Sequence, residues 1–299
     1  MKLLNQLEKS LGEGKFCFTA ELVPALTTDA ESIVNEADPL RGIVEAINIT
    51  DGAAAKTAMS SFAAAAILAS NNIEPVLQLT CRDRNRIALS ADLIGAAAFG
   101  ICNLLPLTGD DAANGDQPDA KAVHDINSAE LISLARNMSD KGVLPNGREI
   151  DKPPHFHIGC ADVPQRIKKD DSYPALVKKI EAGAHFVQTQ LCYDINLIEG
   201  YIADLGERGF LENVNVLIGL GPIASAKSAL WMRENLWGVS VPDTVVQRLE
   251  ESKDPKQEGR RIAIELIEAM QKIKGISGVH LMAPGQSLKA IAALLTELH

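Results

Sequence analysis

Short apolar runs of strand length recur eight times along the 299-residue chain, and each is followed by a segment with helical periodicity. This alternation restricts the fold to α/β architectures with a parallel sheet, either a closed barrel or an open doubly wound sheet. The runs are FCFTAELV (16–23), VEAINITDG (44–52), PVLQLTC (75–81), NLLPLTGD (103–110), FHIGCAD (156–162), FVQTQLCYD (186–194), VNVLIGLGPI (214–223) and GVHLMAP (278–284).

The spacing and number of these units favour the barrel. An open sheet that binds a dinucleotide usually carries GxGxxG after an early strand, whereas GLGPIAS at 219–225 falls in the seventh run and lacks the third glycine. Eight units in a chain of this length predict a single-domain (β/α)8 TIM barrel over residues 1–299. PDTVVQRLEES at 242–252 predicts an extra helix before the last βα unit, and the steps Ile87, Ala91, Ile94 and Ala98 trace one helix face.

Composition excludes several classes of protein. The formal net charge of −10 argues against nucleic acid or an anionic membrane as partner. No stretch approaches the roughly 18 apolar residues of a membrane-spanning helix. Scattered cysteines without a CxxC or zinc spacing predict reduced thiols in a cytoplasmic protein. They are Cys17, Cys81, Cys102, Cys160 and Cys192.

Polar side chains at the carboxyl ends of the runs are the candidate functional residues, because barrels of this kind carry their chemistry there. Glu21 lies between Ala20 and Leu22 in the first run, where an ionised carboxylate is costly unless it is paired or functional. Burial raises the pKa of a carboxyl group, which suits a general acid. Glu21 is therefore either a proton donor or a structural group paired with a basic neighbour.

Two other features have competing explanations. Asp110, in TGDD after the fourth run, is either a ligand contact beside a glycine or an ordinary turn residue. His155 and His157 form an HxH pair, but they come at the start of the fifth run, away from the expected site. We therefore expect no metal site. Residues 110–126, rich in Gly and Asp, predict a long loop.

In order along the chain, the strand ends resemble the methylenetetrahydrofolate reductase family. The most specific pieces are TCRDRN within QLTCRDRNRIAL (78–89), LTGDD (107–111) and QTQ within AGAHFVQTQLCYD (182–194). The TCRDRN piece is typical of a bacterial branch of the family. Weaker pieces are FTAELVP (18–24), NITDGA (48–53), GLGPI (219–223), GVSVPD (238–243) and GVHLMAP (278–284), so the resemblance spans the chain.

This resemblance implies hydride transfer from a reduced flavin to 5,10-methylenetetrahydrofolate, which yields 5-methyltetrahydrofolate. It implies catalytic roles for Glu21, as the acid that protonates folate N10, and for Asp110, beside flavin and pterin. Gln190, Asp110 and Met282 are the implied folate-binding residues. The implied cofactor contacts are Thr50, Gln78, Thr108, Gly109, Asp110, Cys160 and Lys179.

Some positions depart from better-known members of the family. Gln78 stands where many have His, Thr108 where many have Arg, Cys160 near an expected aromatic, and Met232 where the helix after the seventh run carries an aromatic.

FAD is the expected cofactor, with FMN or direct transfer from a nicotinamide as alternatives. The expected electron donor is NADH or a protein, and the chain is expected to form a homo- or hetero-oligomer, without an appended regulatory domain. The rival functions are a pterin-binding methyl-transfer barrel and a subunit of a larger complex that depends on electron input.

Overall fold

The eight predicted strands are confirmed, and they close into one parallel barrel in the order β1 to β8. The computed structural model describes residues 5–165 and 173–298. Closure is made by β1 pairing with β8, with Thr19 opposite His280. The strands are β1 Cys17–Leu22, β2 Ala46–Ile49, β3 Pro75–Thr80, β4 Asn103–Leu107, β5 His157–Asp162, β6 Phe186–Leu191, β7 Asn215–Leu220 and β8 Ile276–Leu281.

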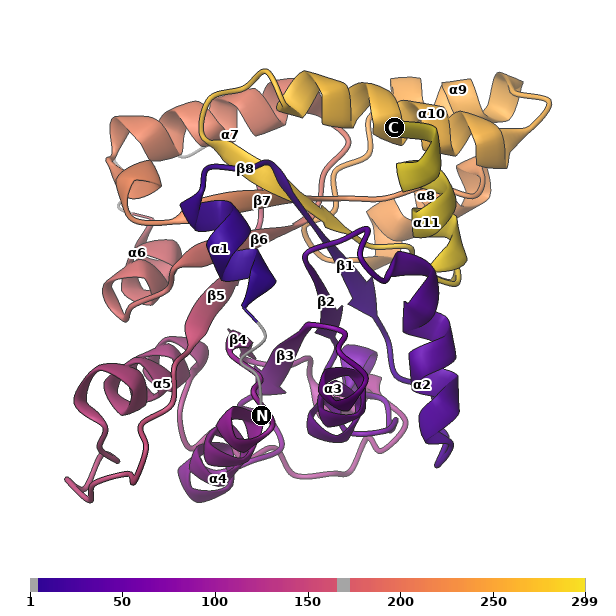
Figure 1. Cartoon of the computed structure of the whole chain (residues 1–299). Coiled ribbons are helices and arrows are strands. Elements are labelled where there is room, and N and C mark those ends of the chain that lie inside the picture. Colours follow the sequence, from indigo (N-terminus) through magenta and orange to yellow (C-terminus); the bar gives the residue numbers. More distant parts are fainter. Residues whose placement is uncertain (1–4, 166–172, 299) are drawn as a thin grey trace.

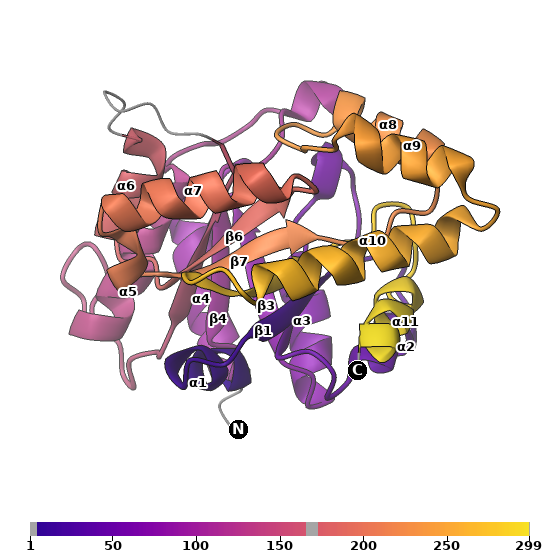
Figure 2. The same cartoon turned by 90° about the horizontal axis from the view of Figure 1, so that it is seen from above.

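Helices surround this barrel (Figure 1), as the alternation predicts. The predicted extra helix is α9, one of three helices that separate β7 from β8. Seen from above, α1 lies at one end of the barrel, and α8 and α9 lie at the other (Figure 2). The helices are α1 Gln6–Gly12, α2 Ala30–Ala37, α3 Ser61–Ser70, α4 Arg86–Ala98, α5 Ser128–Lys141, α6 Pro174–Glu181, α7 Ile195–Glu207, α8 Ala226–Asn235, α9 Asp243–Glu251, α10 Pro255–Met270 and α11 Lys289–Leu298.

Helix α4 forms where the spacing predicts it, but the face that the spacing traced does not enter the core. Leu89, Leu93 and Ala96 are its buried residues. Ile87 and Ile94, on the traced face, are 81% and 43% exposed. Because apolar residues occur on both sides of this helix, periodicity alone identified the helix correctly without identifying its inner face.

An apolar plug closes the amino end of the barrel. Leu7 and Leu11 of α1 pack into a buried cluster with inward residues of six strands, among them Val76, Phe186 and Leu217. The other members of the cluster are Cys17, Ala46 and Leu105. In Figure 1 α1 lies in front of the ring of strands. The start of α1 is fixed by Glu74, whose carboxylate accepts the backbone N–H groups of Gln6 at 2.6 Å and Leu7 at 3.0 Å.

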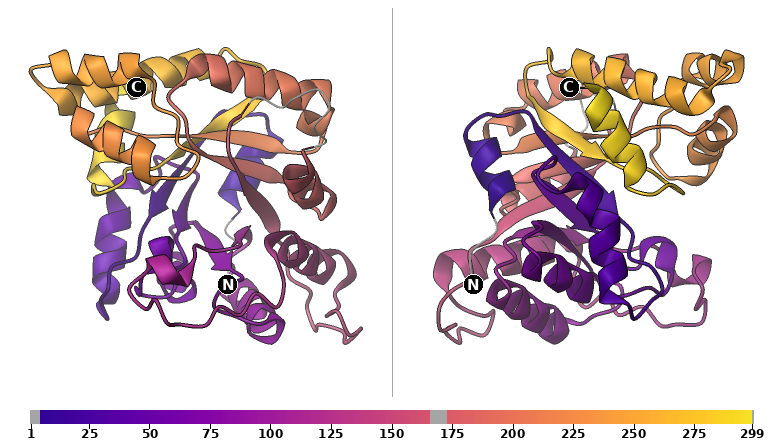
Figure 3. Two further views of the ribbon diagram at one scale, coloured as in Figure 1. Left: turned by 180° about the vertical axis from the view of Figure 1, so that it is seen from behind. Right: turned by 45° about the vertical axis from the view of Figure 1, so that its right-hand side comes forward.

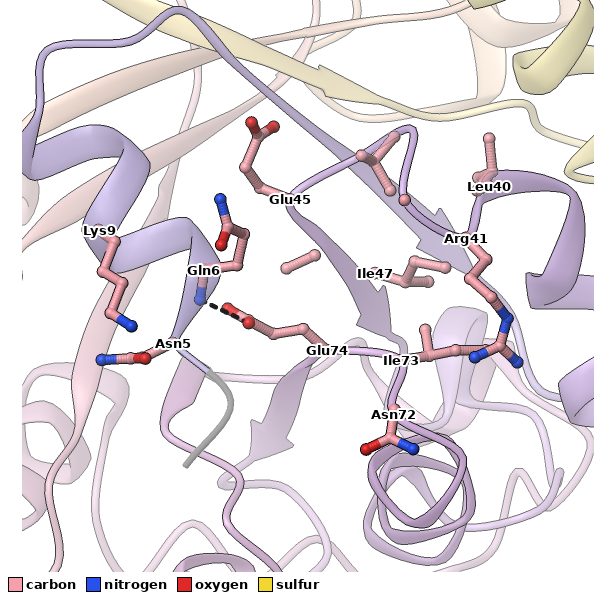
Figure 4. Close-up of a pocket in the computed structure, with 13 residues that line it drawn as sticks. Asn5, Gln6, Lys9, Leu40, Arg41, Glu45, Ile47, Asn72, Ile73 and Glu74 are labelled. Carbon is pink, nitrogen blue, oxygen red and sulfur yellow. Dashed lines mark hydrogen bonds between the residues drawn. The ribbon is translucent and has the colours of Figure 1, made fainter. Parts of the chain in front are cut away.

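A cavity of about 240 Å³ lies beside this plug (Figure 4). Its wall includes Lys9 of α1, Arg41, Glu45 and Glu74. None of the residues predicted for the site lines this cavity. It therefore belongs to the floor of the barrel, at the opposite end from the expected chemistry.

The HxH pair also lies at the amino end, as expected. His155 Nε2 contacts Glu8 at 2.7 Å, which ties α1 to the start of β5. His157 is buried, with its Nδ1 3.1 Å from Asn103 Oδ1. Burial, with a smaller contribution from His185, lowers the pKa of His157 from 6.5 to about 3. The folded protein therefore keeps this ring neutral across a range in which the unfolded chain takes up a proton.

We predict that His157→Gln flattens the acid side of the stability curve. The folded pKa of His157 is depressed, so its effect is absent above pH 6.5 and destabilises the fold increasingly as pH falls toward 3. The wild-type protein should lose about 2 kcal/mol more than the variant between pH 7.5 and 5. Urea unfolding at both pH values measures this, and parallel losses in the two proteins would contradict it.

Candidate active site at the carboxyl end of the barrel

Polar residues occupy neighbouring inward positions near the carboxyl ends of several strands. We call the carboxyl end of the barrel its mouth. Side chains two residues apart on a strand share a face, so a predicted residue at the mouth can have a neighbour two positions earlier that points into the barrel below it. These pairs are Thr19 and Glu21, Asn48 and Thr50, Gln188 and Gln190, and His280 and Met282. The deeper partners Thr19, Asn48, Gln188 and His280 were not selected from the sequence as site residues. The period-two spacing from a selected residue is the signal that would have found them.

These deeper residues form one hydrogen-bonded layer across the barrel interior. Asn48 and Gln188 exchange amide hydrogen bonds of 2.7 and 3.0 Å. Gln188 also donates to Thr19 Oγ1 at 2.9 Å, and that hydroxyl lies 2.9 Å from His280 Nδ1. All four side chains are buried. The layer satisfies its own polar atoms, which offsets the free-energy cost of burying them.

Glu21 lies directly above this layer. Its side chain is 24% exposed, and its Oε2 accepts a hydrogen bond from Gln78 Nε2 at 3.2 Å. His280 Nε2 is 3.8 Å from the same oxygen. Among the described residues, neither a lysine nor an arginine pairs with Glu21 within 4.0 Å, and the basic neighbour of its carboxylate is His280. Gln78, expected at the cofactor, instead has Glu21 as its partner.

The TCRDRN segment organises the loops of the mouth. Arg84 binds the buried carboxylate of Asp51 through two guanidinium nitrogens, at 2.7 and 3.1 Å. Asp51 also accepts hydrogen bonds from Ser61 and from the backbone and hydroxyl of Thr80. Burial opposes ionisation of Asp51, but Arg84 and these donors outweigh it and hold the pKa of Asp51 below its usual value. The ends of β2 and β3 are thereby fixed to each other.

Arg82 extends this scaffold to the loop after β4. Its guanidinium donates to the backbone carbonyl groups of Gly52 and Asp110, at 3.4 and 3.1 Å. The predicted long loop then folds back over β3, where Val123 N–H donates to Arg82 O at 2.7 Å. Gly109 is required here, because φ is +94° and a Cβ would lie 2.9 Å from Arg82 Cβ.

Asp110 has an exposed carboxylate, and it is held by the loop after β2. Its Oδ2 accepts the backbone N–H of Ala54 at 2.8 Å. The preceding Thr108 is exposed, and Gly109 is half-buried. The two loops that carry Thr50 and Asp110 therefore meet over one side of the mouth. The view from behind in Figure 3 shows this carboxyl end of the molecule.

Thr50 is a buried side chain with an unused polar atom. It lies one residue beyond β2 and is 5% exposed. Among the described residues, its Oγ1 is the one buried side-chain N or O atom without a hydrogen-bond partner. A buried hydroxyl without a partner costs free energy. Its position at the mouth suits a ligand that supplies the missing hydrogen bond.

Cys160 and Lys179 lie at the end of β5. The Cys160 side chain is completely buried in the main core, where burial raises the pKa of its thiol to about 12. The expectation that Cys160 contacts the cofactor through its side chain is therefore wrong, because β5 turns this side chain away from the mouth. Lys179 Nζ donates to the carbonyl oxygen of Ala161 at 2.7 Å.

Asp162, the last residue of β5, is held in place by two tyrosines. Its carboxylate accepts the Tyr173 hydroxyl at 2.7 and 2.8 Å and also the Tyr201 hydroxyl. Burial raises the pKa of Asp162 despite these donors. This group holds the end of β5 against α7.

The remaining predicted residues lie on the β6 and β8 side. Gln190 is half-buried, and its Nε2 donates to the carbonyl oxygen of Trp237 at 3.2 Å. Met282 is half-buried, and its N–H donates to Leu220 O at 2.8 Å. Met232, which stands at the position of the expected aromatic, is 3% exposed and packs in the core, whereas Trp237 is 83% exposed.

Two negative observations complete the description of the site. In the described part of the chain, no three His, Cys, Asp or Glu side chains converge as metal ligands. Across residues 5–165 and 173–298, no helix is long and apolar enough to cross a bilayer.

A closed barrel with a hydrogen-bonded carboxylate near the carboxyl end of a strand has the architecture of a TIM-barrel enzyme. The family model of methylenetetrahydrofolate reductase matches residues 6–298, so the chain belongs to this family. Methylenetetrahydrofolate reductase 2 of Schizosaccharomyces pombe is 26% identical over 291 residues, covering 91% of this chain and 43% of that protein. Methylenetetrahydrofolate reductase (NADH) 1 of Arabidopsis thaliana is 24% identical, covering 99% and 50%. The chain thus spans about half the length of these relatives.

A solved structure supports the fold. An uncharacterised protein from Clostridium thermocellum, described as binding two copies of 5-methyl-5,6,7,8-tetrahydrofolic acid, superposes with a TM-score of 0.70. The match covers 98% of both chains at 13% identity. At that identity the likeness establishes the shared barrel alone.

We predict that Arg84→Met destabilises the protein by about 3 kcal/mol, since it leaves the Asp51 carboxylate buried and unpaired. The low pKa of Asp51 contributes stability that is present above its unfolded value and is lost as pH falls through the folded value. Without Arg84, burial should raise the pKa of Asp51 above its unfolded value, so protonation of the buried carboxyl at pH 4.5 should relieve part of the deficit seen at pH 7.5. Urea unfolding at pH 7.5 and 4.5 measures both effects.

Arg86→Met is the matched control for this experiment. Arg86 is 56% exposed and lies 3.8 Å from Asp125, so its loss should cost less than about 1 kcal/mol. Equal destabilisation by the two substitutions would show that the buried pair has no special role.

Proposed function

We propose that this chain reduces 5,10-methylenetetrahydrofolate to 5-methyltetrahydrofolate. The observation that carries the proposal is Glu21, a carboxyl group at the barrel mouth whose Oε2 is held by Gln78. Family membership and the fold shared with a protein described as binding 5-methyltetrahydrofolic acid support the choice of substrate.

In this proposal Glu21 protonates N10 of the folate and opens its five-membered ring. The resulting iminium carbon at N5 accepts hydride and becomes the methyl group. Gln190 and Asp110 bind the pterin through an amide and a carboxylate that both reach the mouth, and Met282 contributes an apolar contact. Because Gln78 donates to the Glu21 carboxylate, it stabilises the anion that remains after proton transfer.

A flavin fits the residues on the β2 to β5 side of the mouth, and we propose FAD. The observation that supports this fit is the unpartnered Oγ1 of Thr50, which a bound ligand would satisfy. Thr108, which carries a hydroxyl, is exposed, and the adjoining Gly109 is half-buried. Lys179 has further N–H donors for a phosphate beyond its bond to Ala161. When bound, a reduced flavin supplies the hydride.

We predict that Thr50→Val weakens FAD binding about tenfold, the usual effect of losing one hydrogen bond to a ligand. The free protein should be as stable as wild type or more stable, because valine removes a buried hydroxyl that has no partner. Fluorescence titration with FAD and thermal unfolding of the free protein are the two measurements. Thr50→Ser keeps the hydroxyl and serves as the control. Unchanged FAD affinity in Thr50→Val would refute this contact.

The electron donor that we propose is NADH or a protein partner. Names of relatives include both NADH and NADPH, as in the proteins of Arabidopsis thaliana and Caenorhabditis elegans.

A methyl-transfer barrel is the rival function favoured by one observation, the folate ligand of the similar solved structure. A visible spectrum of the purified chain separates the two, because a colourless protein that binds methyltetrahydrofolate and oxidises no NADH even with added FAD would favour the rival.

We predict that Glu21→Gln abolishes folate reduction while oxidation of NADH by an artificial acceptor continues at the wild-type rate. The amide keeps the shape of the side chain but has no acidic proton to give. Steady-state rates of the two reactions, with thermal unfolding as a check on the fold, provide the measurement. If both reactions fell together, Glu21 would not be the specific acid for the folate step.

A further inference from the structure

His280, on β8, is buried behind Glu21 and was not among the residues predicted for the site. It is 3% exposed, and its Nε2 is 3.8 Å from Glu21 Oε2. Gln78 Nε2 is 3.2 Å from the same oxygen. Two nitrogen atoms therefore face Oε2, and neither of these contacts involves Oε1.

The hydrogen-bonded layer beneath Glu21 determines which nitrogen of His280 carries the proton. The two amide hydrogens of Gln188 are directed to Asn48 Oδ1 and Thr19 Oγ1. The Thr19 hydroxyl hydrogen is then free to bond His280 Nδ1 at 2.9 Å, which makes Nδ1 the acceptor. Among the described residues the Thr19 hydroxyl has no other acceptor, so this arrangement places the proton of the neutral ring on Nε2, which faces Glu21.

A positively charged His280 would not fit this layer. It would place an N–H at Nδ1, 3.3 Å from the amide nitrogen of Gln188, which already donates its own hydrogens elsewhere. The groups around the ring are Thr19 on β1, Gln188 on β6 and the backbone of Gly219 on β7, all uncharged. Among the described residues, Glu21 is the titratable group that the structure pairs with His280.

We propose that His280 is a positioning residue for the proton donor: its Nε2–H faces Oε2 of Glu21 from 3.8 Å, a distance that a small shift of the Glu21 side chain would shorten to a hydrogen bond, so that Oε2 is kept as an acceptor and the acidic proton stays on Oε1, toward the mouth. This inference rests on the proposed function, since it takes Glu21 as the acid. One proton leaves Oε1 for N10 of the folate, and the electron pair of the broken O–H bond remains on the carboxylate. His280 keeps its own proton throughout and, with Gln78, stabilises that carboxylate. Glu21 is protonated again from water at the mouth.

Two substitutions separate this role from simple packing. His280→Asn keeps an acceptor near Nδ1 for Thr19 but places nothing at the Nε2 position. His280→Gln carries an amide N–H as far as Nε2 reaches. The kcat for folate reduction should fall about 10- to 100-fold in His280→Asn, as for loss of a hydrogen bond to a charged group, and recover largely in His280→Gln. The KM for folate should stay within about twofold.

The pH profile is the readout that a packing role would leave unchanged. Loss of a donor to the carboxylate disfavours the ionised form, so the alkaline limb of folate reduction should move to higher pH in His280→Asn. In His280→Gln the alkaline limb should return to its wild-type position. Oxidation of NADH by an artificial acceptor should be unaffected in both. Equal losses in the two variants with an unmoved limb would overturn the proposal.

A measurement on the free protein keeps this proposal distinct from the proposed function. Nitrogen-15 NMR of the histidine-labelled chain, with the His280 signals identified by their loss in His280→Asn, should show the neutral Nε2–H form. A ring protonated on Nδ1, or charged at neutral pH, overturns the proposal whatever the activity. If Glu21→Gln blocks folate reduction and His280→Asn does not alter it, this proposal alone fails. A wild-type chain that shows the expected ring but reduces no folate overturns the proposed function, and the catalytic role of His280 with it.

Discussion

The mouth of this barrel depends on one buried ion pair, between the Asp51 carboxylate and the guanidinium of Arg84. Asp51 lies two residues beyond β2 and Arg84 leads into α4, so the pair joins two βα units that share no other charged contact of this burial among the described residues. Once these ends are fixed, the neighbouring Arg82 can reach the carbonyl oxygens of both flanking loops. The loops that carry Thr50 and Asp110 are thus set by a scaffold that takes no part in the proposed chemistry.

Beneath the mouth, the barrel buries amides, a hydroxyl and an imidazole where most barrels have aliphatic layers. Such a layer is tolerated because each polar atom finds a partner, and its partners lie on strands far apart in sequence. A fully connected polar layer has few alternative arrangements, since moving one side chain would leave several donors and acceptors unsatisfied. Glu21 therefore rests on a rigid base while its outer oxygen faces a more open region.

Much of the fold could be predicted from the sequence, because the alternation of apolar runs and helices reports burial directly. Every predicted strand is present, and the extra helix before β8 is α9. The site was predicted less completely. Glu21 stands out as a charge in an apolar strand, but its partners Gln78 and His280 are 57 and 259 positions away. Such contacts depend on closure between β1 and β8 and on strand register, neither of which a local pattern encodes. For the same reason Cys160 was placed in the mouth, whereas the pleat of β5 turns it into the core.

The apolar plug formed by α1 has a consequence for the supply of protons. Leu7 and Leu11 seal the floor with aliphatic side chains, which conduct no protons, and the polar layer above them has no acidic member. Proton exchange between Glu21 and bulk water is therefore favoured at the mouth, where its side chain is 24% exposed. A substrate that covers the mouth would also isolate Glu21 from solvent. Glu21 could then give one proton to each substrate that binds. In the proposed reaction, product departure would then be the step that lets water protonate Glu21 again.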